Sequence, residues 1–224
     1  MSHAPLVAAV ALTAIFATAA RADRSVSDGD FLDESAWNIQ AGPTGPNAPT
    51  GGYVATGGNP GKYIGFQWSL AAGPNLGVMG PFSNNLLWDP SVDGAIVRII
   101  GSVDVISSAP EDFDLIAFAF IQNGHIFGVP ITLTAADTWQ SFSIDVDPLA
   151  LPIVFGPPFD MDFSDTAPPI NFGIFVFSQP TGTGDEPLVT LGFDNIHFTA
   201  IAPEPATLGM LALTAAALMR ARRR

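Results

Sequence analysis

The chain has 224 residues, of which 48% are hydrophobic and only 13% charged, with a net charge of −13. Between Asp23 and Ala202, three basic residues stand against 20 acidic ones, so this part carries a net charge of about −17. Such a surface repels phosphate backbones and argues against nucleic acid as a partner. The 17 Phe residues argue against disorder, and the absence of Cys means that no disulfide stabilises the chain.

The N-terminal segment has the features of a secretory signal peptide. An apolar stretch over Pro5–Ala20 runs into Ala20-Arg21-Ala22, and an apolar run of ~15 residues before an A-x-A site is typical of such signals. We expect cleavage after Ala22, which assigns residues 1–22 to the signal. Cleavage after Ala19 and a buried N-terminal helix are the alternatives.

The last 22 residues contain three parts in order. They are Pro203-Glu204-Pro205, the apolar segment Ala206–Met219, and the basic residues Arg220, Arg222, Arg223 and Arg224. This layout resembles the PEP-CTERM sorting signal. The resemblance implies that an exosortase cuts near Pro-Glu-Pro after the secretion machinery has exported the chain. The protein would then pass to the cell surface or extracellular matrix, and residues 203–224 form this signal.

The apolar segment Ala206–Met219 predicts a short transmembrane helix. Its roughly 14 residues span ~21 Å at ~1.5 Å each, less than a usual span of ~20 residues. It crosses if the arginines snorkel and the bilayer thins. The arginines favour a cytoplasmic C-terminus, which places the acidic part outside. A permanent anchor that is never cut is the alternative.

Residues 23–202 predict one all-β domain, an antiparallel jelly-roll β-sandwich, because short apolar runs alternate with Gly, Pro, Asn and Asp clusters. The runs over Asp114–Gln122 and Ile170–Ser178 are apolar on both faces, so they belong at the centre of a sheet or under a cover. Gln122–His125 predicts a hairpin turn, and the segments Ala41–Pro60 and Pro148–Pro169 predict loops. The predicted strands are Tyr63–Trp68, Ala95–Ser107, Asp114–Gln122, Ile126–Thr134, Trp139–Val146, Ile170–Ser178 and Leu188–Ala200.

Four short motifs follow one another along the chain: Asp30-Phe31 with Trp37, Gly57–Ile64, Thr138-Trp139, and Gly192–Ile196. Their order is similar to that of laminin-B-type and carbohydrate-binding-module jelly rolls of the galactose-binding-like superfamily. This resemblance implies a structural calcium between the first and last strands, with Asp33 or Glu34 and Asp194 as ligands. The alternative is that Asp194 caps a turn while Asp33 and Glu34 face water. The run Asp160, Asp162, Asp165 is a second candidate, although it lacks the Gly and Glu of an EF-hand loop.

Sugar binding requires exposed aromatic faces supported by polar groups. Trp139 fits the start of a strand and predicts a core position. An acidic groove with few basic residues suits neutral glycans better than charged ones. The candidates, which lie in or beside predicted loops and for which core packing is the alternative, are Trp37, Tyr53, Trp68 and Trp88.

The sequence contains no G-x-S-x-G elbow, zinc motif or phosphate loop, so we expect no enzyme activity and no catalytic residues. We therefore expect an exported surface or matrix protein whose sandwich binds exopolysaccharide or another surface partner. Two alternatives stay open: an inert matrix component without a ligand, and a glycan hydrolase that uses a carboxylate pair.

Overall fold

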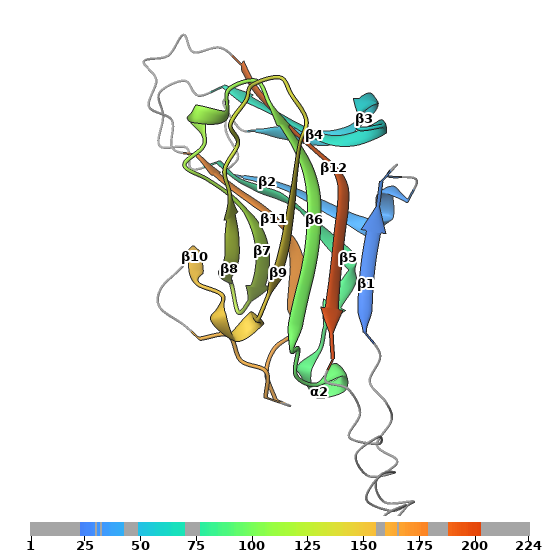
Figure 1. Cartoon of the computed structure of the whole chain (residues 1–224), viewed down its shortest axis with the longest axis vertical. Coiled ribbons are helices and arrows are strands. Elements are labelled where there is room, and N and C mark those ends of the chain that lie inside the picture. The colour runs from blue at the N-terminus through green and yellow to red at the C-terminus, as the bar shows by residue number, and fades with distance from the viewer. Residues whose placement is uncertain are drawn as a thin grey trace, which may run out of the picture.

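Alternating apolar and polar residues form strands along most of the described chain. The structure is a computed structural model, and it describes residues 23–29, 31, 33–42, 49–69, 77–155, 160–164, 166–178 and 188–202. The strands form two antiparallel sheets that pack face to face as a β-sandwich (Figure 1). The predicted all-β sandwich is therefore confirmed.

The first sheet has the strand order β3-β4-β12-β6-β9, and β1 pairs with β12 beside β4. The long strand β12 pairs along one edge with two strands, β4 at its first half and β1 at its second half. The strands are β1 (Arg24–Asp28), β3 (Thr50–Gly58), β4 (Gly61–Ser69), β6 (Arg98–Ser107), β9 (Gln140–Val146) and β12 (Leu188–Ile201).

The second sheet has the order β10-β8-β7-β11-β5-β2. Short helices connect strands at the ends of the sandwich: η1 (Glu34–Ala36), α2 (Pro90–Asp93), η2 (Pro110–Asp112) and η3 (Pro148–Ala150). The strands are β2 (Trp37–Gly42), β5 (Gly77–Trp88), β7 (Leu115–Gln122), β8 (His125–Ile131), β10 (Ile153–Phe155) and β11 (Ile170–Ser178).

Phenylalanine side chains fill the space between the sheets. Phe198 of β12 packs edge-on against Phe118 and Phe172 of the opposite sheet, with ring centroids 6.0 Å apart in both pairs. All three side chains are almost completely buried. Edge-to-face contacts of this kind add to the free energy of burying the rings.

Seven predicted strands are found, with ends shifted by a few residues. The two strands that are apolar on both faces, β7 and β11, lie side by side in the middle of their sheet, as predicted. The predicted hairpin turn joins β7 to β8. Its Asn123 and Gly124 have φ angles of 54° and 75°, which a type I′ turn requires.

Five strands, β1, β2, β3, β5 and β10, were not predicted from the sequence. The segment Ala41–Pro60, predicted as a loop, contains β3 and the end of β2. Strand β5 was not predicted, because Pro81 and a pair of asparagines interrupt its apolar pattern. Both strands are stabilised by neighbours far along the chain, β4 for β3 and β11 for β5. The segment Pro148–Pro169 also contains a short strand, β10.

The chain enters and leaves the sandwich at one end, which we call the terminal end. Arg24 of β1 pairs with Ala200 of β12, and the Ala202 backbone N–H donates to the Asp23 carboxylate at 3.1 Å. Figure 1 shows the start of β1 and the tip of β12 together beside α2. The predicted signal peptide and transmembrane helix lie outside the described residues. Within the described ranges, no helix is long and apolar enough to span a bilayer.

Candidate functional site

A groove lies on the outer face of the first sheet, over β3, β4, β12 and β6. Its volume is about 400 Å³. Polar side chains and exposed backbone share its surface with three aromatic residues, Tyr53, Tyr63 and Phe66. The lining residues are Thr50, Gly51, Gly52, Tyr53, Val54, Tyr63, Gly65, Phe66, Gln67, Ile106, Asp137, Thr190, Leu191 and Gly192.

A row of three glycines forms the floor of this groove. Gly52 pairs with Gly65, and Gly65 pairs with Gly192, so the row crosses three adjacent strands. Outward-facing residues of a sheet normally cover it with side chains. The three glycines have no side chains that could cover the sheet. A Cβ atom added to Gly52 would meet no atom within 4 Å. The groove is therefore open to solvent above Gly52.

The Tyr63 ring lies over the other two glycines and forms a wall of the groove. A Cβ atom on Gly192 would come within 2.8 Å of Tyr63 Cε2, and one on Gly65 within 3.2 Å. Tyr63 also packs edge-on against Trp139, with ring centroids 5.5 Å apart. The Trp139 indole donates to the Gly57 carbonyl at 3.1 Å. These contacts fix the orientation of the Tyr63 ring.

Polar side chains surround the glycine floor. Thr50, Gln67 and Thr190 lie on the outer faces of three neighbouring strands and are exposed, and Asp137 adds a carboxylate. Among the described residues that line the groove, none is Lys or Arg. The groove therefore offers hydroxyl, amide and carboxylate groups to a polar ligand that carries no negative charge.

A polar cluster supports the turn between β3 and β4, next to the groove. The Asp194 carboxylate, fully buried in β12, accepts from the Asn59 backbone N–H, and from the Asn195 N–H at 2.8 Å. The facing Asp104 accepts from the side-chain amides of Asn195 and Asn59 at 2.7 and 3.1 Å. The cluster thus ties the turn to β6 and β12. Because Gly57 lies at the end of β3 just before this turn, the cluster also holds the Trp139 contact in place.

The four predicted sugar-binding residues do not lie together around the groove. Trp88 is fully buried and its Nε1 donates to the Gly94 carbonyl at 2.6 Å, while Trp37 is 4% exposed and packs against Phe31. These two indoles present no face to a ligand, because they belong to the core as the alternative interpretation had it. The Trp68 side chain lies outside the described part of the structure.

Tyr53 lines the groove, but its ring faces inward. It packs against Phe31, and its hydroxyl donates to the Glu34 carbonyl at 2.7 Å. Trp139, which the sequence placed in the core, instead lies half-buried beside Tyr63 on the outer face. Sequence analysis missed Tyr63. The alternation Tyr63-Gly65-Gln67 within β4 was the signal, since it places these three residues on one face.

The three predicted calcium ligands contact different partners. Asp33 accepts from Ser35 at the start of η1, and Glu34 forms an ion pair with Lys62 at 2.7 Å. Asp194 belongs to the polar cluster above. Within the described ranges, no group of three acidic or histidine side chains could hold a metal ion. As the side chains lie, these residues do not form a shared site, and calcium binding stays a prediction.

The acidic run near residue 162 stabilises a loop. Asp162 accepts from the Ser164 backbone N–H at 2.8 Å, and its own N–H donates to Gln122 at 2.8 Å. Asp165 lies outside the described residues. The contacts of Asp162 are those of a local turn that fastens the loop to the end of β7.

No family model and no curated protein matches this chain. Solved structures of similar shape include the family 11 carbohydrate-binding module of the cellulase Lic26A-Cel5E of Clostridium thermocellum. The TM-score is 0.47 at 15% identity, over 81% of this chain and 97% of the module. The cellulose-induced protein Cip1 gives 0.46 at 14% identity, over 77% and 96%. The K1 cleaved adhesin domain of Lys-gingipain from Porphyromonas gingivalis W83 gives 0.45 at 11% identity, over 80% and 99%.

Proposed function

We propose that this chain is an exported surface or matrix protein whose groove binds a neutral glycan, such as a chain of exopolysaccharide. The observation that carries the proposal is the open groove floor at Gly52, beside the Tyr63 ring that covers Gly65 and Gly192. A sugar ring has flat C–H faces and a rim of hydroxyl groups. It needs an apolar surface of matching width and nearby hydrogen-bonding groups.

The groove supplies both kinds of contact. The bare backbone at Gly52 lets a ligand come close to the sheet, and the fixed Tyr63 ring adds apolar surface without a large loss of side-chain entropy. Thr50, Gln67 and Thr190 can donate and accept hydrogen bonds from hydroxyl groups. Because these residues project from rigid strands, the arrangement is preorganised, which lowers the cost of binding.

Charge selects among glycans. The part from Asp23 to Ala202 carries a net charge of about −17, and Asp137 lines the groove itself. A uronic or sulfated glycan would be repelled by this field, whereas a neutral one would not. The proposed ligand class is therefore neutral.

The proposal includes export and sorting. Its support is the apolar stretch before Ala22 and the order of Pro203-Glu204-Pro205, apolar segment and arginines at the C-terminus. An exosortase would be the partner that cuts the chain. The resemblance of the sandwich to galactose-binding-like jelly rolls is part of the same proposal. Intact mass spectrometry of the protein from its native source should show Asp23 as the first residue and no residues beyond the Pro-Glu-Pro region. An uncut chain would contradict export and sorting.

A glycan array tests the proposed binding. Purified protein should bind neutral polysaccharides and leave uronic and sulfated ones unbound at the same salt concentration. Preference for charged glycans would contradict the electrostatic selection. Absence of any signal would favour the inert matrix component that the sequence left open.

A further inference from the structure

We infer that the terminal end of the sandwich is a membrane-contact surface that rests on zwitterionic lipid headgroups. The surface consists of Val92 in α2, Val97 before β6 and Leu149 in η3. The inference rests on the proposed membrane insertion of residues 206–219, so it applies to the chain before exosortase cleavage, and it does not depend on glycan binding.

Exposed apolar side chains gather at this end of the sandwich. The described residues include five large hydrophobic side chains that are exposed, and only Leu188 lies at the opposite end. Val92 is 62% exposed, Val97 48% and Leu149 74%. Exposed apolar residues that concentrate at one end of a fold are typical of an interaction surface.

These three residues lie at the end of the sandwich where β12 ends. The Val97 backbone N–H donates to the Ile201 carbonyl at 2.9 Å, next to the last described residue, Ala202. Leu149 follows β9, whose Val146 pairs with Ile99 at the start of β6. The side chains therefore lie on the same end as Asp23 and Ala202.

The short spacer before the apolar segment identifies lipid as the occupant. Only residues 203–205 lie between Ala202 and Ala206, and three residues span at most ~11 Å at ~3.6 Å each. Once residues 206–219 are in the bilayer, the terminal end is held close to the headgroup region. Such tethering gives a high effective concentration, so that even weak apolar contacts form.

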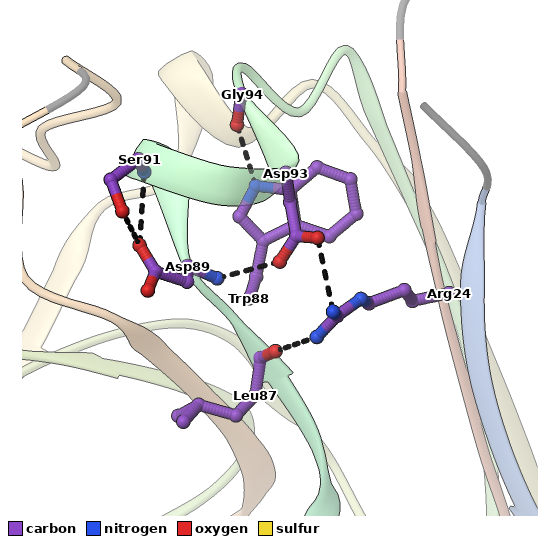
Figure 2. Close-up of polar contacts among 7 residues, drawn as sticks. All are labelled: Arg24, Leu87, Trp88, Asp89, Ser91, Asp93 and Gly94. Atoms are coloured by element: carbon purple, nitrogen blue, oxygen red, sulfur yellow. Dashed lines mark hydrogen bonds and ion pairs between the residues drawn. The ribbon is translucent and has the colours of Figure 1, made fainter. Parts of the chain in front are cut away.

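Polar contacts join α2 to β1 and β5 at the terminal end. Figure 2 shows Arg24 of β1 reaching α2: its guanidinium donates to the Leu87 carbonyl at 2.5 Å and lies 3.1 Å from the Asp93 carboxylate. Asp93 also accepts from the Asp89 N–H at 2.8 Å, which fixes α2 against β5. The helix that carries Val92 is thus fastened to the strand that follows the predicted cleavage site.

The acidic groups at this end select the kind of lipid, because the two arginines that the structure describes there, Arg24 and Arg98, pair with Asp93 and Asp145. The Asp89 and Asp147 carboxylates cap α2 and η3, directly beside Val92 and Leu149. They would face the same headgroups and be repelled by anionic lipids. A zwitterionic surface accepts the apolar side chains without that repulsion.

This orientation places the groove away from the membrane. Thr190 and Gly192 lie in the first part of β12, and the 14-residue strand is ~46 Å long at ~3.3 Å per residue. With its terminal end on the bilayer, the sandwich opens its groove toward the extracellular polymer.

Single cysteines test the contact cleanly, because the chain contains none. V92C and L149C are labelled with an environment-sensitive fluorophore in the full chain, which is then reconstituted into phosphatidylcholine vesicles with headgroup-level quenchers. L188C is the matched control, since Leu188 is 59% exposed at the opposite end. T214C reports whether the C-terminal segment has inserted.

We expect quenching of V92C and L149C at least about twofold stronger than that of L188C, because only the terminal end reaches the interface. Replacing half of the lipid by phosphatidylglycerol should reduce this difference. Equal quenching of the three labels while T214C is deeply buried would overturn the contact. So would protection of V92C that depends on protein concentration rather than lipid, which would identify a second copy. If T214C is accessible from water, the proposed insertion fails first.

Discussion

At the scale of single residues, ion pairs hold the few basic side chains of this acidic chain. Arg98 at the start of β6 contacts Asp145 of β9 through two hydrogen bonds, at 2.6 and 2.5 Å. The hydrogen bond from Arg98 lowers the pKa of Asp145 below its ordinary value. Both side chains are about half exposed, so solvent screens the pair and its effect on stability is small.

The pair predicts a pH-dependent contribution to stability. A carboxyl whose pKa is lower in the folded state stabilises the fold above its unfolded pKa and loses this effect as pH falls through the folded value. Relative to D145A, wild-type protein should melt slightly higher at neutral pH, and the difference should vanish as pH falls below ~4. Melts from pH 7 to pH 2 provide the measurement. A difference that persists at pH 2 would show that the pair is not its source.

Predictions for single residues were correct where the residue and its neighbours in the chain determine the conformation. The Asn123-Gly124 turn has a local cause, since its positive φ angles favour these two residue types. The aromatic residues were harder, because the exposure of an indole depends on strands far along the chain. Trp88 is covered by the core, and Trp139 is left outside it beside Tyr63.

At the scale of elements, glycines act in opposite ways in the two sheets. Gly80 of β5 lies against β11 so closely that a Cβ atom there would be 1.6 Å from the Ile174 carbonyl oxygen. Gly52 of β3 has open space at the same atom. One glycine permits the strands to pack, and the other leaves the groove empty.

Two matched substitutions test this difference. Gly80→Ala should lower the free energy of unfolding by ~1–3 kcal/mol or more, because the extra methyl forces β5 and β11 apart. Gly52→Ala should leave it within ~0.5 kcal/mol, since nothing is displaced. Urea unfolding of both variants measures the two values. Similar losses in both would mean that β5 and β11 do not pack as described.

A strand could be predicted when its own residues form a recognisable apolar pattern. The strands β7 and β11 have continuous apolar runs, so their existence and central place were predictable. Strand β3 is rich in glycine, and β5 contains Pro81, so neither has a recognisable pattern of its own. Their pairing partners stabilise them, and pairing is not visible in one sequence. The groove was missed for the same reason, because its floor joins glycines from three strands.

On the scale of the whole molecule, negative charge is the main constraint. With about −17 between Asp23 and Ala202, self-repulsion opposes the compact state unless polar groups or ions offset it. The polar cluster of Asp104 and Asp194 shows one solution, in which amide N–H groups from Asn59 and Asn195 face the carboxylates.

The calcium prediction for Asp33, Glu34 and Asp194 is tested by thermal melts in calcium and in EDTA. A bound structural ion stabilises only the folded state, so its removal should lower the melting temperature. Magnesium at the same concentration serves as the control for general charge screening. The same melting temperature in calcium and EDTA would contradict the prediction.

The groove floor at Gly52 is the proposed binding surface, and filling it is the most direct test. Gly52→Val should place two methyl groups in the groove, with no atom in their way at the Cβ position. Ser143→Val is the matched control, since Ser143 is an exposed residue of β9 in the same sheet but outside the groove. Both variants should melt as the wild-type protein does.

Isothermal titration with the neutral glycan that binds best on the array gives the measurement. We predict that Gly52→Val weakens binding by at least about tenfold, equal to ~1.4 kcal/mol, while Ser143→Val binds like wild type. Wild-type affinity in folded Gly52→Val would contradict the account, because the ligand would then bind elsewhere.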